Sequence, residues 1–180
     1  PHRPSTPSPA VISCRAAGPS AGGGSGYAGG MTDPDTTSEA RAALLQGPDI
    51  GRYAAGNCGL PFAFTFRSGQ PGPHAMIAAL VHGNEICGAI ALDRLLQAGL
   101  RPQRGSLSLV FANTAAYAAE PAARFLDEDL NRVWAPEILS GRRQSRELTR
   151  ARELLPLLEQ ADFLLDLHSL QHQAAPVALA

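Results

Sequence analysis

His82, Glu85 and His168 are the residues of this sequence whose types and spacing favour metal chemistry. His82 and Glu85 form a His-x-x-Glu pair after the apolar run "HAMIAALV", and His168 ends a second apolar run, "DFLLDLHS". Two imidazoles and one carboxylate are a known catalytic zinc set that leaves the fourth position to water. Zinc lowers the pKa of that water toward ~7 and so supplies hydroxide at neutral pH. The His-x-x-Glu spacing alone also fits a surface His followed by a Glu at a helix start.

The segments around these residues predict strands that alternate with helices, and therefore a layered α/β sheet. The expected strands cover residues 61–69, 74–81, 106–113 and 162–169. The expected helices cover residues 38–47, 86–100 and 145–161, and a long polar loop covers residues 114–143. Pro156 should kink the last helix or split it near Arg152. If the strands before His82 and His168 are parallel neighbours, both imidazoles emerge at one edge of the sheet.

Asp166 precedes His168 by two residues and therefore lies on the same face of the expected strand. A carboxylate at this position would accept the second ring N–H of a zinc-bound His and so fix its tautomer. A buried Asp with a purely structural role is the alternative that the sequence leaves open.

The composition is that of a soluble globular domain, with 44% hydrophobic and 17% charged residues among 180. The formal net charge of −1 gives no sign of a nucleic-acid or anionic-membrane partner. No apolar stretch approaches the ~20 residues of a membrane span. Three widely spaced cysteines argue against a disulfide framework and for a reducing compartment, so we expect a cytoplasmic protein. The sequence does not determine the oligomeric state.

Residues 1–30 are rich in Pro, Ser and Gly and poor in large apolar residues. Such a composition cannot offset the entropy of ordering, so we expect a disordered low-complexity leader. The first methionine is Met31, and the pattern of strands and helices follows it.

Three motifs follow one another along the chain: "HGNE" with a following Gly88, "RFLDEDLNR", and "DLHS". In this order they resemble the succinylglutamate desuccinylase and aspartoacylase family of zinc carboxypeptidase-like hydrolases. The resemblance covers roughly residues 48–180, and three ordered motifs are far more specific than one. It implies a three-layer α/β/α fold with a mixed, mostly parallel sheet. Residues 31–180 would be the N-terminal part of the catalytic domain, truncated at its C-terminal end.

The resemblance also implies roles for individual residues. The two histidines and Glu85 would bind one zinc ion. Arg124 would polarise the scissile carbonyl and stabilise the oxyanion, a task suited to a fixed guanidinium donor. Asn131 and Arg132 would clamp the substrate carboxylate, which the planar fork of Arg matches bidentately. Asn113-Thr114 stands where many family members have Asn-Pro, which leaves the path of the following loop open.

The implied activity is zinc-dependent cleavage of the amide bond of a small N-acyl amino acid by attack of zinc-bound hydroxide. A zinc carboxypeptidase or an esterase acting on a related carboxylate is one alternative. Family members use a later glutamate as general base and acid, which would lie beyond Ala180. A catalytically incomplete metal-binding fragment is therefore the other alternative, and we expect the chain by itself to be inactive.

Overall fold

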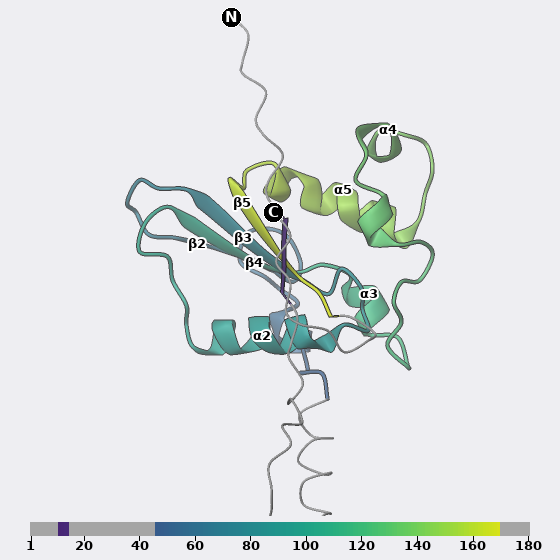
Figure 1. Ribbon diagram of the computed structural model, residues 1–180, viewed down its shortest axis with the longest axis horizontal. Helices are drawn as coiled ribbons and strands as arrows, with labels where there is room; N and C mark the ends of the chain where they lie inside the picture. Colours follow the sequence, from purple (N-terminus) through teal and green to yellow (C-terminus); the bar gives the residue numbers. More distant parts are fainter. Residues whose placement is uncertain (1–10, 15–45, 170–180) are drawn as a thin grey trace, which may run out of the picture.

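A five-stranded sheet forms the body of the computed structural model, which describes residues 11–14 and 46–169 (Figure 1). The strands are β1 (Val11–Cys14), β2 (Ala63–Arg67), β3 (His74–Ala79), β4 (Ser106–Phe111) and β5 (Phe163–Leu167). They lie in the order β1-β5-β3-β4-β2. Only the β2–β4 pair of this sheet is antiparallel, so the prediction of a mixed, mostly parallel sheet is confirmed.

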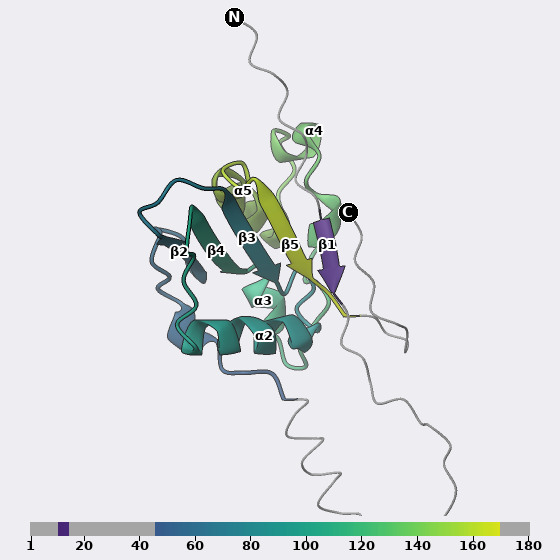
Figure 2. The same ribbon diagram turned by 60° about the vertical axis from the view of Figure 1, so that its left-hand side comes forward.

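Two helices cover opposite faces of the sheet, which makes the fold three-layered (Figures 1 and 2). Successive side chains of a strand point to opposite faces. Met76 and Ala78 of β3 thus pack with α5 (Arg146–Leu158), whereas Ala79 packs with α2 (Ile86–Gln97). Apolar residues at helical spacing on each helix, such as Ala89 and Leu92 of α2, complete the two halves of the core.

The segment between β4 and α5, expected as one loop over residues 114–143, contains three short helical turns. They are α3 (Thr114–Tyr117), the 3-10 turn η2 (Leu130–Arg132) and α4 (Pro136–Leu139). Asn113 caps α3, because its side chain accepts the N–H of Ala116. Another 3-10 turn, η1 (Gly51–Tyr53), precedes β2.

Two sequence-based expectations differ from the structure. The predicted split near Arg152 is wrong, because α5 is one helix from Arg146 to Leu158 with Pro156 inside it, whereas the alternative of a kink stays a prediction. Pro156 lies in the last turn, where its missing N–H removes a single intrahelical hydrogen bond. Val11–Cys14, within the expected disordered leader, pairs in parallel with β5.

The rest of residues 1–30 and most of the helix expected at 38–47 lie outside the described residues. None of the helices in the described part of the chain combines the length and apolar character needed to cross a bilayer.

Candidate metal centre and adjoining loop

The pairing of β3 with β5 brings His82 and His168 to the same edge of the sheet. The two strands are parallel neighbours, with Ala79 opposite Leu167, and His168 directly follows Leu167. β3 ends three residues before His82, so the expected strand over residues 74–81 is shorter than predicted. His82 and Glu85 lie in the turn between β3 and α2, and Glu85 occupies the N-cap position of α2.

Leu80 redirects the chain from β3 toward this turn. Its φ is +61°, a left-handed conformation that is costly for a residue with a branched side chain. Complete burial of its side chain and a 2.8 Å hydrogen bond from the Asn113 N–H to its carbonyl oxygen hold it there. Such strain at the approach to a polar cluster is typical of functional sites.

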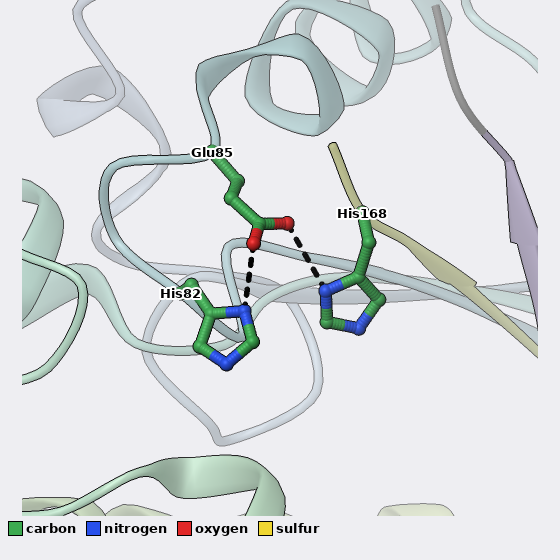
Figure 3. Close-up of side chains that lie close together, drawn as sticks. All are labelled: His82, Glu85 and His168. Atoms are coloured by element: carbon green, nitrogen blue, oxygen red, sulfur yellow. Dashed lines mark hydrogen bonds and ion pairs between the residues drawn. The ribbon is translucent and has the colours of Figure 1, made fainter. Parts of the chain in front are cut away.

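The Glu85 carboxylate lies between the two imidazole rings (Figure 3). Its Oε1 is 2.8 Å from Nδ1 of His82, and its Oε2 is 3.0 Å from Nδ1 of His168. The ring centroids are 5.1 Å apart, and one potential ligand atom from each residue lies within 4.8 Å of the others. His82 and Glu85 are buried, and His168 is half-buried. The structure thus brings together the three residues that the sequence singles out.

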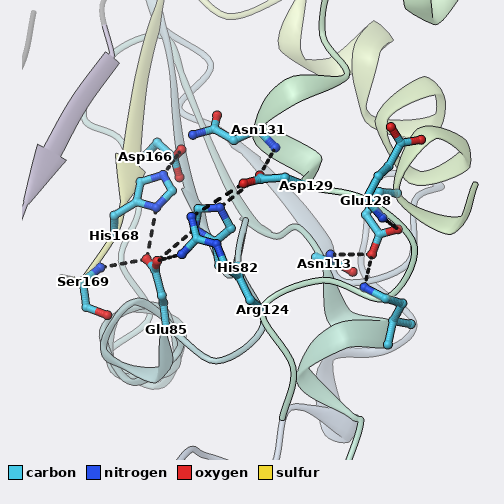
Figure 4. A network of polar contacts seen from close by, with 12 residues as sticks. His82, Glu85, Asn113, Arg124, Glu128, Asp129, Asn131, Asp166, His168 and Ser169 are labelled. Atoms are coloured by element: carbon cyan, nitrogen blue, oxygen red, sulfur yellow. Dashed lines mark hydrogen bonds and ion pairs between the residues drawn. The ribbon is translucent and has the colours of Figure 1, made fainter. Parts of the chain in front are cut away.

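A second carboxylate contacts the outer nitrogen of each imidazole (Figure 4). Nε2 of His82 is 3.1 Å from Oδ1 of Asp129, and Nε2 of His168 is 2.6 Å from Oδ2 of Asp166. Each Nδ1 faces Glu85, so both ring nitrogens of each imidazole contact a carboxylate, a group that only accepts. Asp166 therefore makes the hydrogen bond expected from the sequence, whereas the corresponding contact of Asp129 was not foreseen.

This donor set fits a zinc ion. An unprotonated Nδ1 and a carboxylate oxygen are both acceptors, so their close approach is favourable only with a proton or a cation between them. Two imidazole nitrogens and one carboxylate match the protein ligands of catalytic zinc sites. Carboxylates on the outer nitrogens are the partners that orient zinc-binding histidines.

Burial and hydrogen bonding act in opposite directions on the charges of this cluster. Burial alone would raise the pKa of Glu85, but hydrogen bonds from His168, His82 and the Ser169 N–H outweigh it and lower that pKa to about 2. Burial would likewise lower the pKa of His168, yet its hydrogen bonds to Asp166 and Glu85 raise it to about 10. The carboxylates thus strongly favour positive charge at this position.

The loop over residues 123–132 brings Arg124 beside the cluster (Figure 4). Nη1 of Arg124 is 3.4 Å from Oε1 of Glu85, and its Nη2 is 3.6 Å from Oδ2 of Asp129. With 39% of its side chain exposed, Arg124 can also reach an incoming molecule. Asn131 lies nearby, and its backbone N–H donates to Asp129. Arg132 is exposed, and within residues 46–169 no hydrogen bond or ion pair joins its side chain to the cluster.

Gly83 lets the loop approach the turn that carries His82. Its backbone N–H donates to the carbonyl oxygen of Arg124 at 3.1 Å. A Cβ at this position would overlap the backbone of Ala116 and Tyr117 and lie 2.6 Å from the carbonyl oxygen of Ala123. Only glycine therefore permits this contact.

A cavity of about 270 Å³ lies on the α5 side of the sheet, and one of the residues that line it, Asp166, contacts His168. Its walls are mainly apolar and come from β3, β5, α5 and Trp134, while Asn131 and Asp166 supply polar atoms. Oδ1 of Asp166 is buried and has no hydrogen-bond partner among the described residues, whereas its Oδ2 contacts Nε2 of His168. The cavity thus combines mainly apolar walls with polar side chains from Asn131 and from Asp166, the partner of His168.

Comparison with known proteins gives a consistent result. A profile of the succinylglutamate desuccinylase/aspartoacylase catalytic domain matches residues 71–175. An N-acyl-aromatic-L-amino acid amidohydrolase of Homo sapiens is 36% identical over 111 residues, which cover 56% of this chain and 34% of that protein. The protein of the same name from Mus musculus is 38% identical over 113 residues, which cover 57% and 35%. The chain thus spans about a third of the length of these relatives.

Solved structures of similar proteins carry related names. Murine aminoacylase 3 is 37% identical, with a TM-score of 0.44, over 55% of this chain and 36% of that one. The succinylglutamate desuccinylase of Chromobacterium violaceum is 25% identical, with a TM-score of 0.49, over 61% of this chain and 37% of that one.

Proposed function

The chain belongs to the succinylglutamate desuccinylase/aspartoacylase family, and we propose that the protein hydrolyses the amide bond of a small N-acyl amino acid. One observation carries the proposal: the cluster of His82, Glu85 and His168 lies beside the guanidinium of Arg124. A metal-ligand set and a fixed donor for a developing oxyanion are the two elements that amide hydrolysis needs in one place.

We propose that His82, Glu85 and His168 hold one zinc ion. A bound zinc ion would supply Lewis acidity and lower the pKa of water at this edge of the sheet. With zinc bound, Asp129 and Asp166 would accept from Nε2 of each imidazole, which would leave both Nδ1 atoms available as ligands.

The remaining polar groups would bind and orient the substrate. Arg124 would donate to the scissile carbonyl oxygen and stabilise the negative charge that develops there. Its contacts with Glu85 and Asp129, at 3.4 and 3.6 Å, limit where its guanidinium can lie. Asn131 and the exposed Arg132 would hold the substrate carboxylate, because a guanidinium binds a carboxylate through two parallel hydrogen bonds.

We favour a substrate that carries an apolar or aromatic group. The human and mouse relatives carry the name N-acyl-aromatic-L-amino acid amidohydrolase. The cavity beside Asn131 and Asp166 has mainly apolar walls and a volume of about 270 Å³. Burial of an aromatic ring in such a space is favourable by roughly 2 kcal/mol or more.

Proton transfer to the leaving nitrogen is not assigned to any described residue. Glu85, Asp129 and Asp166 each already contact an imidazole nitrogen. General acid and base catalysis of this step typically contributes about 10²–10⁴-fold.

The test uses the full-length protein and a panel of N-acetylated aromatic, aliphatic and acidic amino acids, with C-terminal peptides and simple esters as further substrates. We expect hydrolysis of N-acetyl aromatic amino acids that a chelator abolishes and that zinc restores. Arg124→Ala should lower kcat by about 10²–10³-fold. Arg142→Ala is the matched control, since Arg142 is an exposed Arg outside the cluster.

Other results would revise the proposal. Activity confined to peptides or esters would favour the carboxypeptidase or esterase alternative. Chelator-resistant hydrolysis would exclude the metal from the reaction, and equal loss of activity in the two Arg variants would remove the role of Arg124.

A further inference from the structure

Glu147 is a charged residue whose side chain is completely buried, away from the histidine cluster. It lies in the first turn of α5 and is 0% exposed. Its Oε1 accepts the Leu126 N–H at 2.7 Å and the side-chain amide of Asn113 at 3.1 Å. Its Oε2 accepts the N–H groups of Asp127 at 3.1 Å and Glu128 at 3.3 Å. Asn113 and Glu128 mark this end of the polar network in Figure 4.

The chemistry of these four contacts requires a carboxylate. All four partners donate, and an ionised carboxylate is the side chain that accepts through both oxygens. Burial alone would raise the pKa of Glu147, but the N–H groups of Leu126 and Asp127 and the amide of Asn113 outweigh it and lower that pKa. The N-terminus of α5 also favours negative charge.

The three backbone groups that Glu147 binds belong to the loop that carries the proposed substrate-binding residues. Residues 126–128 lie between Arg124 and Asp129, and the latter holds His82. Among the described residues, the other hydrogen bonds and ion pairs of these three residues with the α5 side involve exposed partners. They are the 2.6 Å ion pair of Glu128 with Arg143 and the 2.8 Å hydrogen bond from the Arg146 N–H to Asp127. Glu147 is therefore the buried anchor of this part of the loop.

We propose that Glu147 is a positioning residue, whose carboxylate holds residues 126–128 so that Arg124 and Asp129 face the His82 turn. The expected effect of Glu147 on catalysis rests on the proposed function. Its structural consequence is independent, because Glu147 itself touches none of the three candidate metal ligands.

Glu147→Gln is the discriminating variant in the full-length protein. Gln has the same shape but replaces one accepting oxygen with an amide that donates, so two donors of the loop or of Asn113 lose their acceptor. We expect kcat/KM for the best N-acyl amino acid to fall by about 10–100-fold. Bound zinc in zinc-saturated protein should stay at about one ion per chain, because its ligands come from other elements. Hydrogen–deuterium exchange at the amides of residues 126–128 should become faster.

Two further variants separate positioning from general loss of stability. Leu157→Ala removes buried side-chain volume near the other end of α5 and should lower Tm while leaving kcat/KM within about twofold. Glu147→Asp keeps the carboxylate on a shorter side chain and should restore part of the kcat/KM that Glu147→Gln loses. This variant also tests the proposal if Glu147→Gln does not fold.

Unchanged exchange at residues 126–128 in Glu147→Gln would overturn the proposal. A kcat/KM of Glu147→Gln within about twofold of wild type would overturn it too. So would an equal fall in kcat/KM for Leu157→Ala, when each variant is assayed at the same number of degrees below its own Tm. If the wild-type protein hydrolyses no N-acyl amino acid, the proposed function fails, and the exchange measurement still decides whether Glu147 holds the loop.

Discussion

Gly83 donates its backbone N–H to the carbonyl oxygen of Arg124 at 3.1 Å, which joins the turn that carries His82 to the loop that carries Arg124. This contact is formed by the main chain alone, so it depends on the absence of a side chain at residue 83 rather than on a particular pair of side chains. The relative position of the metal-ligand turn and the proposed oxyanion donor thus depends on a glycine as well as on the side-chain contacts of the loop.

Gly83→Ala should displace the loop, because the added methyl group overlaps the backbone of Ala116 and Tyr117. We expect the free energy of unfolding to fall by about 1–3 kcal/mol. Activity measured well below Tm should fall further than stability alone explains. Gly51→Ala is the control, since its nearest neighbour is the side chain of Asp49. Equal activity of the two variants would contradict the role of Gly83.

His82→Ala and His168→Ala should each lower zinc affinity by more than the roughly 100-fold that loss of an outer hydrogen-bond partner costs. The measurement is metal content after dialysis against a weak chelator, followed by competition with a fluorescent zinc indicator. His74→Ala is the control, because His74 lies on β3 and contacts Gln160 and Ser108 instead of the cluster. Stoichiometric zinc in both ligand variants would rule out the proposed site.

Asp129→Asn should lower zinc affinity by about 10–100-fold without removing a ligand. The Asn side chain accepts from Nε2 of His82 more weakly than a carboxylate and can present its amide to that nitrogen instead. Asp127→Asn is the matched variant from the same loop, and its amide oxygen can still accept from the Arg146 N–H. The interpretation fails if both variants bind zinc as wild type does.

Asp93 should contribute to stability in a pH-dependent manner. Burial alone would raise its pKa, but hydrogen bonds from Tyr53, Gln97 and Arg52 outweigh it and lower that pKa. A lowered native pKa means that the stabilisation is fully present above the unfolded value of ~3.9 and is lost as pH falls through the native pKa. Hydrogen bonds to a charged group contribute about 1.5–3 kcal/mol.

The corresponding experiment compares Asp93→Asn with wild type in urea at pH 7 and at successively lower pH. We expect wild type to be more stable by about 1–2 kcal/mol at pH 7, because exposed Arg52 weakens the network. That difference should shrink below about pH 4. Effects of acid on the histidine cluster are common to both proteins and cancel. A difference that does not change with pH would contradict the prediction.

The strands and the long helices could be predicted because each carries a regular pattern. β3 and β5 are nearly continuous apolar runs between two covering layers, and α2 shows apolar residues at helical spacing with a stop at Gly99. The juxtaposition of His82 and His168 followed from one assumption, that their strands are parallel neighbours, and this is confirmed. The role of the two histidines in binding zinc stays a prediction, as does the cytoplasmic location.

The contacts of Asp129 and Glu147 could not be predicted in the same way. Asp129 meets His82 across 47 residues and Glu147 meets Leu126 across 21, and neither separation belongs to a periodic pattern. Their positions depend on the path of an irregular loop, which hydrogen bonds to single side chains determine. The "LDEDLN" stretch belongs to the "RFLDEDLNR" motif. The acidic residues of that motif are the sequence feature that could have indicated a role for Asp129.

The separation of Glu85 from His168 by 83 residues has a consequence for how the protein acquires its site. β3 lies between β4 and β5 in the sheet, so His168 reaches Glu85 only after a strand from the end of the described region has docked beside β3. Contacts between such distant parts of a chain form slowly, because a large loop must close before they give any stabilisation. Capture of a metal ion by all three donors would therefore be a late event of folding, and its appearance in a refolding experiment would report that the β3–β5 pairing is complete.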